Sequence, residues 1–331
     1  MAEQVKICYK NILETSTVTV TTENTSFPKY RLYDRDISKL FKGTGFASPF
    51  AILLGQGAVI SYEVDRLIIP ARHNLNGLAC SLRYSTDNFS ADDHEAVGWT
   101  QGDALLINKP FTAQTKQYWK LNIPTGPSLN GLAGSCAAGT LIDQGGINWT
   151  TAGVIIGSIV TRVVDGKYGI VTSITTSGGG PDDLIIFAGG TSPVFNLFDA
   201  YTVTTGLTPE LTEIFLGKTY TFQANPLIGS REGWKRNLSS EETESGLDRD
   251  VKLGESRRYR DYELSNIESA QKADFESWEA ECQGVKPFWV IDHYGVAIYM
   301  KMLNELEFTY LLDDPSYGCI LRLREVLGQT T

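Results

Sequence analysis

Short segments in which apolar and polar residues alternate recur along the whole chain. Residues 15–25 read TSTVTVTTENT, so Val18 and Val20 alternate with threonine, a good strand former. Alternation with a period of two places successive side chains on opposite faces of a strand. Glycine, asparagine and proline separate these segments, as they do between strands. We therefore expect strands within 15–25, 58–70, 79–85, 104–111 and 117–123.

The second half of the chain adds further strand-like segments. Residues 153–174 are rich in valine and isoleucine, and Asp165-Gly166 among them predicts a tight hairpin turn. Residues 238–255 are polar and charged, which predicts an exposed loop or β-arm. More strands are expected at 184–187, 199–203, 213–222, 257–264, 287–292, 296–302 and 319–325.

One segment, 269–282, has a helical rather than a strand period. Ser269 is the expected N-cap, and Gly284 with Pro287 is expected to stop the helix. Its expected buried face carries Ala270, Phe275, Trp278 and Cys282.

Many short strands, regular turn residues and a single helix predict a mainly β protein built from sandwiches or barrels. The chain has 331 residues, which exceeds the roughly 100–200 residues of a typical domain. We therefore expect two or three domains.

The charge of the chain argues against a nucleic-acid partner. The formal net charge is -10, and hydrophobic and charged residues make up 42% and 21% of the chain, as in ordinary globular proteins. The densest basic cluster, Arg257, Arg258 and Arg260, is surrounded by Glu255, Asp261 and Glu263. Phosphate backbones would repel such a surface, so no nucleic acid is expected to bind.

The cysteines and the apolar runs predict a soluble protein made in a bacterial cytoplasm. The five cysteines are scattered singly and form no C-x-x-C pair, so we expect reduced thiols rather than a zinc site or a disulfide framework. The N-terminus has no apolar signal core, and no run approaches the ~20 apolar residues that span a bilayer. Membrane insertion is therefore not expected, and the protein would reach the outside only as part of a particle.

The familiar catalytic motifs do not occur in the sequence. His73, His94 and His293 form no H-x-x-x-H or H-E-x-x-H pattern, and there is no G-x-S-x-G or phosphate-binding loop. Residues 92–95 (DDHE) could ligate a metal, although a solvated loop is the favoured interpretation, and His73 is expected to bond to the backbone of a turn. We expect no enzyme activity, no cofactor and no resident metal, with calcium at a loop left open.

Several motifs in residues 15–123 resemble discoidin-like domains, also called coagulation-factor type C domains. They are residues 64–69 (VDRLII), 71–75 (ARHNL), 82–87 (LRYSTD) and 117–121 (QYWKL), and 213–217 (EIFLG) is similar to the closing strand of that family. The resemblance implies an eight-stranded jelly roll, a β-sandwich, in residues 1–145, with closing strands near 205–223. Residues 146–204 would then be an inserted small β module, and Cys8 has no partner for the disulfide typical of the family.

The segment 216–327 resembles the C-terminal part of bacteriophage minor tail proteins. The resemblance lies in Asn225-Pro226, residues 254–258 (GESRR), the helix around Trp278 and residues 286–289 (KPFW). It implies a C-terminal α+β assembly domain at 224–331 and a structural role in a phage tail, as a minor tail, distal tail or adaptor protein of the virion. The implied partners are other tail proteins and copies of the same chain in three- or six-fold symmetry.

A glycan of the host surface is the ligand that the sequence favours. Residues 85–101 are expected to form a long loop at one end of the jelly roll. Phe89 and Trp99 could stack on a sugar ring while Asp92, Asp93 and Glu95 accept its hydroxyl protons. The alternative for Trp99 is that it anchors the loop to the core. The alternative function is a carbohydrate-binding module or receptor-binding protein without an assembly role, and a polysaccharide-degrading enzyme is the least favoured class.

A second cluster predicts a contact with a protein partner. Trp234 lies close to Arg236 in a polar stretch, and Arg257 and Arg258 follow. Tryptophan and arginine are enriched at protein interfaces. These four residues are therefore the expected interface anchors.

Overall fold

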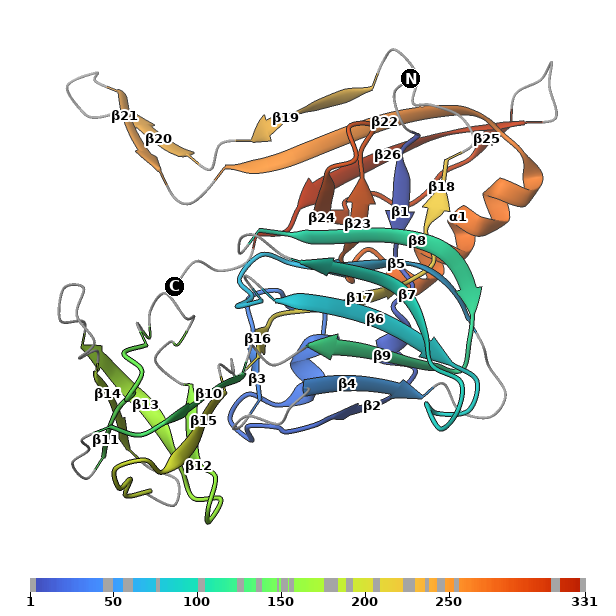
Figure 1. Ribbon diagram of the computed structural model, residues 1–331. Helices are drawn as coiled ribbons and strands as arrows, with labels where there is room; N and C mark the ends of the chain where they lie inside the picture. Colours follow the sequence, from blue (N-terminus) through green and yellow to red (C-terminus); the bar gives the residue numbers. More distant parts are fainter. Residues whose placement is uncertain are drawn as a thin grey trace.

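Over the residues that it describes, the computed structural model shows three β units and one α-helix (Figure 1). One unit is a sandwich, the second is a module inserted into it, and the third is a sheet curled around the helix. The structure describes residues 4–43, 50–55, 62–75, 78–100, 105–123, 128–134, 139–147, 149, 154, 158–175, 184–188, 193–204, 209–222, 230–235, 238–242, 248–252, 256–310 and 316–327.

The sandwich consists of a five-stranded and a three-stranded antiparallel sheet. Trp119, Leu82 and Leu67 belong to one apolar core between the two sheets, and Trp119 is fully buried in it. The expectation of a mainly β chain that contains a β-sandwich is confirmed. The order of the first sheet is β2 (Thr17–Val20), β4 (Phe50–Gly55), β9 (Tyr118–Ile123), β6 (Ala79–Ser85) and β7 (His94–Thr100), and that of the second is β17 (Phe215–Gly217), β5 (Glu63–Ile69) and β8 (Ile107–Thr115).

A buried asparagine connects the start of the sandwich to its last strand. The side chain of Asn11 donates to the carbonyl of Ile214 at 2.7 Å and accepts from the N–H groups of Leu13 and Leu216, each at 3.2 Å. This residue also caps the short 3₁₀ helix η1 (Ile12–Glu14). A second 3₁₀ helix, η2 (Lys29–Leu32), lies in the connection between β2 and β4.

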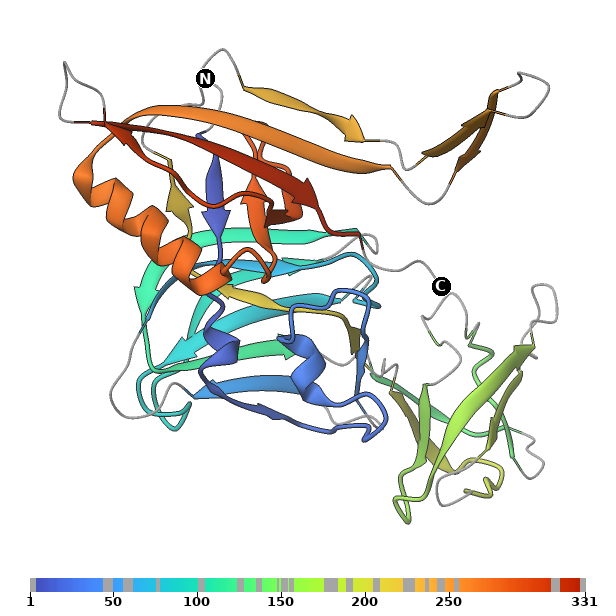
Figure 2. The same cartoon turned by 180° about the vertical axis from the view of Figure 1, so that it is seen from behind.

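The inserted module is a six-stranded antiparallel sheet beside the sandwich (Figures 1 and 2). Its core includes Trp149 and Tyr201, whose rings lie 5.7 Å apart. Gly166 has a φ of +68° and donates to the carbonyl of Arg162 at 2.9 Å, which confirms the predicted hairpin turn. The strands are, in order, β10 (Ser128–Leu132), β15 (Ala200–Thr204), β12 (Ile159–Arg162), β13 (Tyr168–Thr175), β14 (Leu184–Ala188) and β11 (Thr140–Ile142).

The module starts earlier in the chain than the sequence interpretation placed it. Its first strand begins at residue 128, whereas the insertion was expected to begin at residue 146. The chain returns to the sandwich through β16 (Glu210–Leu211), which pairs with β3 (Phe41–Lys42). Both connections therefore lie at the same end of the sandwich, where β9 finishes.

The third unit is a sheet whose strands come from both ends of the chain. β1 and β18 belong to it although they lie outside residues 224–331, to which the C-terminal domain was assigned. The sheet curls, since Phe222 next to its first strand contacts Tyr262 on its sixth at a ring distance of 6.5 Å. The order is β18 (Tyr220–Thr221), β1 (Lys6–Cys8), β23 (Phe288–Ile291), β24 (Ala297–Met302), β26 (Tyr317–Glu325), β22 (Arg257–Ile267) and β19 (Arg231–Lys235), with β25 (Thr309–Tyr310) paired to β26.

Helix α1 (Ser269–Cys282) lies in the concave side of this sheet, and its bounds are those predicted from the sequence. Phe275, Trp278 and Cys282 are buried, whereas Ala270 is exposed and Gln271 is buried instead. Glu268 rather than Ser269 occupies the N-cap position, and its side chain makes no capping hydrogen bond. The helix needs no strong cap because its apolar contacts with the sheet stabilise it. No helix in the described part of the chain is long and apolar enough to span a bilayer.

A β-hairpin projects from the C-terminal sheet and leaves the body of the molecule (Figures 1 and 2). It consists of β20 (Leu238–Glu242) and β21 (Asp248–Lys252), which pair only with each other among the described strands. We call residues 238–252 the arm. The sequence left an exposed loop or a β-arm open for this polar segment, and the structure shows a β-arm.

Candidate functional site

The turn between β6 and β7, where the glycan loop was expected, is held by an aspartate. The Asp87 carboxylate accepts from the Ser85 hydroxyl at 2.8 Å and from the N–H groups of Ser90, Ala91 and Asp92 at 2.7–3.2 Å. These bonds, that from Ser85 above all, hold the pKa of Asp87 below its usual range. The turn is therefore a fixed structure with its own hydrogen-bond centre rather than a long open loop.

Asp92 is bound by the same turn. Its carboxylate accepts from the Thr86 hydroxyl at 2.6 Å and from the Thr86 N–H at 2.8 Å, which lowers the pKa of Asp92. His94 Nε2 lies 2.6 Å from the other carboxylate oxygen, and the His94 ring stacks on Tyr84 at 5.5 Å. Asp92 thus connects the turn to β7. Its carboxylate oxygens already contact groups of the protein, so they are largely occupied.

Asp93 and Glu95 lie on the outer face of the five-stranded sheet, next to two cations. Asp93 accepts from Arg83 Nε at 2.6 Å and from Lys120 Nζ at 3.1 Å, and Glu95 lies 3.5 Å from Arg83. Partial burial raises the pKa of Asp93, but the bonds from Arg83 and Lys120 outweigh it and hold that pKa below its usual range. Both carboxylates are exposed, so they remain accessible to a ligand.

Phe89 completes this group. The Lys120 ammonium lies 4.1 Å from the centre of its ring, and the side chain is half-buried. Phe89 has a φ of +62°, a conformation that few non-glycine residues adopt and that the Asp87 hydrogen bonds hold in place. We call Arg83, Phe89, Asp93, Glu95 and Lys120 the sandwich cluster.

The expectation that Trp99 is a stacking platform is wrong. Trp99 is only 8% exposed and belongs to the core between the two sheets. The reason is that β7 begins at His94 and its register against β6 shifts between Leu82 and Arg83. Glu95 therefore lies opposite Arg83 on the outer face, whereas Trp99 lies opposite Cys80 on the inward face. The alternative, in which Trp99 anchors this region to the core, is the one that the structure shows.

The sequence interpretation missed Arg83 and Lys120. Their side chains are neighbours because β6 and β9 pair with Arg83 opposite Lys120. The alternation in 79–85 and 117–123 already places both residues on polar faces. The pairing of two strands separated by some 30 residues is what brings them together, and no local pattern encodes it.

The predicted interface residues lie at the edge of the C-terminal sheet. Trp234 is 59% exposed on β19, and the Arg258 guanidinium of β22 lies 4.9 Å from its ring centre. Arg257 is exposed opposite Lys235. Arg236 lies outside the described residues. The structure thus brings Trp234 and Arg258 into contact. Both residues are distant in sequence from the sandwich cluster.

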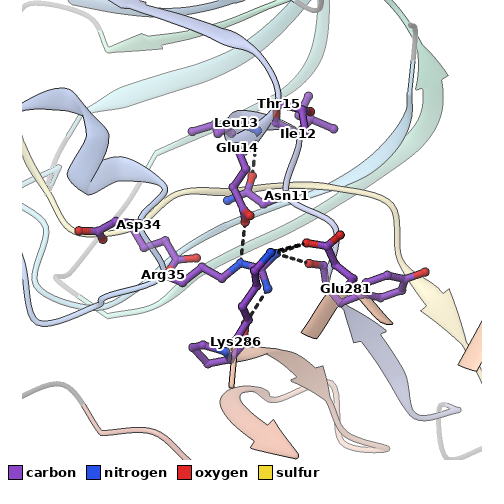
Figure 3. A network of polar contacts seen from close by, with 12 residues as sticks. Asn11, Ile12, Leu13, Glu14, Thr15, Asp34, Arg35, Glu281 and Lys286 are labelled. Carbon is purple, nitrogen blue, oxygen red and sulfur yellow. Dashed lines mark hydrogen bonds and ion pairs between the residues drawn. The ribbon is translucent and has the colours of Figure 1, made fainter. Parts of the chain in front are cut away.

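A polar network joins the sandwich to the C-terminal sheet (Figure 3). Arg35 donates to Glu14 at 2.6 Å, to the Tyr9 carbonyl at 2.9 Å and to the Pro287 carbonyl at 3.2 Å. It also lies 3.4 Å from Glu281 of α1. Apolar residues of both units also form one buried cluster, namely Cys8, Ile68, Phe215, Trp289, Ile291, Ala297 and Tyr299.

His73 has structural partners within the backbone of the chain. His73 accepts from the Leu75 N–H at 3.2 Å, and its Nε2 lies 2.8 Å from the Leu105 carbonyl, which confirms its expected role in a turn. Within the described ranges, no three His, Cys, Asp or Glu side chains converge as metal ligands would. The predicted metal alternative at 92–95 therefore gains no support, because Asp92 and Asp93 point to different protein partners.

No protein-family model and no curated protein matches this chain. Among solved structures, it is similar to chitosan-binding module 1 of a chitosanase/glucanase from Paenibacillus sp. IK-5, with 19% identity, a TM-score of 0.31, and coverage of 35% of this chain and 86% of that chain. It is also similar to the family 32 carbohydrate-binding module of Clostridium perfringens NanJ, solved with galactose, at 14% identity, a TM-score of 0.31, and coverage of 37% and 89%. At such low values these similarities carry no argument, and the sandwich assignment rests on strand order and core.

Proposed function

We propose that this chain is a non-catalytic carbohydrate-binding protein and that the sandwich cluster contacts the saccharide. The observation that carries the proposal is the arrangement of Asp93 and Glu95 around Arg83, beside a half-buried Phe89 ring. Carboxylates accept hydrogen bonds from sugar hydroxyls, guanidinium and ammonium groups donate hydrogen bonds to sugar oxygens, and an aromatic ring packs on the apolar face of a pyranose. One small surface offers all three.

The rigidity of the turn supports the same proposal. Ordering side chains on binding costs about 0.5–1.5 kcal/mol for each flexible group. Here Asp87 holds the turn and the ion pairs hold the polar groups before a ligand arrives. The turn also lies at the opposite end of the sandwich from the inserted module, because β6 ends at Ser85 whereas β9 leads into the module after Ile123. The module therefore leaves the cluster uncovered.

Saccharide binding by a double variant tests this proposal. In the double variant Asp93→Asn and Glu95→Gln, affinity for chitotriose or galactose, measured by calorimetry, should fall about tenfold or more, because two charged acceptors are lost. The matched control is Asp165→Asn, an exposed aspartate in the hairpin turn of the inserted module, which should bind as the unmodified chain does. Equal affinities of the double variant and the control, or no binding of any tested sugar by the unmodified chain, would refute the proposal.

A second candidate is a structural subunit that assembles with other copies or with phage tail proteins in a virion. The arm favours it, because a two-stranded hairpin alone is at best marginally stable in water. A hairpin that pairs with no other described strand would gain stability by packing on a neighbouring subunit. Light scattering on the chain with and without the arm tests this candidate.

A further inference from the structure

A groove of about 410 Å³ lies beside the exposed edge of the C-terminal sheet. In the pairing of β19 with β22, Glu232 is opposite Arg260 and Trp234 is opposite Arg258, so alternation places all four side chains on one face. Asp292 and Tyr294, from the turn between β23 and β24, complete the lining. This surface belongs to a different unit from the sandwich cluster and shares no residue with it.

Two aromatic rings border the groove and are open to solvent. Trp234 is 59% exposed and Tyr294 is 75% exposed, the latter in the turn around Gly295. Arg258 covers part of the Trp234 ring at 4.9 Å. The other five tryptophans of the chain are at most 8% exposed. An exposed tryptophan is therefore unusual in this protein, and it lies at a concave site.

The polar groups of the groove are fixed and incompletely satisfied. Arg260 is 5% exposed, and its terminal nitrogens donate to Glu232 and Asp292, each at 2.9 Å, and to the Tyr262 hydroxyl at 3.1 Å. The Nε–H groups of Arg260 and Arg258 are buried and have no hydrogen-bond partner among the described residues. Buried donors of this kind are rare because each loses its hydrogen bond to water without replacement.

We infer that this groove is a second saccharide site, which takes a neutral, hydroxyl-rich oligosaccharide. A pyranose ring packs on Trp234 or Tyr294, and its hydroxyls donate to Glu232. The inference rests on the proposed function for its ligand class and extends it to a surface outside the sandwich. The two arginines are balanced by Glu232 and Asp292, so the groove lacks the net positive charge that a phosphate or sulfate ligand would need.

The single exposed tryptophan gives a specific readout. Acrylamide quenches exposed tryptophans, so most of the quenchable fluorescence should come from Trp234, and Trp234→Phe should remove it. We would titrate a panel of neutral tri- and tetrasaccharides into the full chain and measure protection of Trp234 from acrylamide. A saccharide in the groove should reduce quenching, and Tyr294→Ala should weaken the affinity read from this protection about tenfold.

Two variants separate this inference from the proposed function. Protection of Trp234 should persist in the double variant Asp93→Asn and Glu95→Gln, because that variant alters only the sandwich cluster. If a saccharide binds by calorimetry but leaves Trp234 fully quenchable, the groove inference is overturned while the proposed function stands. If Trp234 becomes protected only with rising protein concentration and without sugar, the groove is a protein interface, which also overturns the inference. Absence of binding by every saccharide would overturn both.

Discussion

At the scale of single residues, Glu213 is an acidic group that the fold removes from water. It is buried at the junction of the sandwich and the C-terminal sheet, where the Tyr299 hydroxyl lies 2.8 Å from its Oε2 atom. Burial raises the pKa of Glu213 to about 8, although the Tyr299 hydroxyl and Arg35 act in the opposite direction. Glu14 and Asp34, also near, raise it further. The carboxyl is therefore neutral in the folded protein at pH 7.

This raised pKa predicts a stability that falls with pH. In the unfolded chain Glu213 loses its proton near its ordinary pKa of about 4.3, whereas in the folded protein it keeps that proton up to about pH 8. Because the folded state binds more protons, the stabilisation that Glu213 gives the folded state is complete below about pH 4. This stabilisation is lost as the pH rises toward 8. Urea unfolding at several pH values should show this slope, and Glu213→Gln should flatten it. A variant with the same slope as the unmodified chain would show that Glu213 is not its source.

At the scale of elements, the turn between β6 and β7 depends on one side chain. Asp87→Ala removes the acceptor of three backbone N–H groups and of the Ser85 hydroxyl. We expect faster amide exchange at Ser90, Ala91 and Asp92 and weaker saccharide binding, with little change in the melting temperature, because the turn is exposed. Hydrogen exchange measured by mass spectrometry checks this. The control Ser90→Ala keeps its backbone donor and should exchange at the original rate, and equal exchange in both variants would contradict the role of Asp87.

Local sequence patterns predict the strands and the helix of this protein better than they predict which strands pair with one another. The predicted strand at 79–85 and the predicted helix at 269–282 agree with β6 and α1, because alternation and helical spacing are properties of neighbouring residues. The partners of β1 could not be read in this way. It pairs with β18 and β23, more than 200 residues away in the chain. Such pairing is decided by packing of the finished core rather than by any local pattern.

Local sequence likewise predicts some residues of the candidate site and not others. Phe89, Asp93 and Glu95 could be selected from composition, because aromatic and acidic residues in a polar segment fit a sugar ligand. Trp99 could not be excluded, because its burial depends on where β7 begins and on the register shift in its pairing with β6. The groove beside Trp234 could not be found at all, since Asp292 and Tyr294 reach it from a turn some 60 residues away.

At the scale of the whole molecule, Arg35 connects the sandwich to the C-terminal sheet. Its side chain is 8% exposed, while those of Glu14 and Glu281 are 21% and 35% exposed. Removing the arginine leaves Glu14 and two carbonyl groups without this donor, and we expect Arg35→Ala to lower the free energy of unfolding by about 2–3 kcal/mol. Calorimetry should also show the two units unfolding in separate transitions. Lys39→Ala, which breaks only exposed ion pairs, should leave the stability almost unchanged, and equal effects of the two variants would refute this role.

The arm can be removed without disturbing the sheet that carries it. β19 ends at Lys235 and β22 begins at Arg257, and these two residues are direct partners in the ladder. A short Gly-Ser turn can therefore replace the residues between them and close the two strands as a simple hairpin. The shortened chain should keep its circular dichroism spectrum and melting temperature, since the arm makes no pairing with the body among the described strands.

If the arm joins subunits, the mass measured by light scattering should fall from that of an oligomer to that of one chain when the arm is removed. The matched control inserts the same Gly-Ser turn at Asp165-Gly166, another exposed hairpin, and should leave the mass unchanged. Assembly that survives removal of the arm would place the subunit contact elsewhere. A full chain that remains monomeric at every concentration would refute self-assembly through the arm. The protein would then act as a single unit, and one polymer could fill both of the proposed saccharide sites. In that case the sandwich cluster and the groove would act together, and a long polysaccharide should bind more tightly than a trisaccharide.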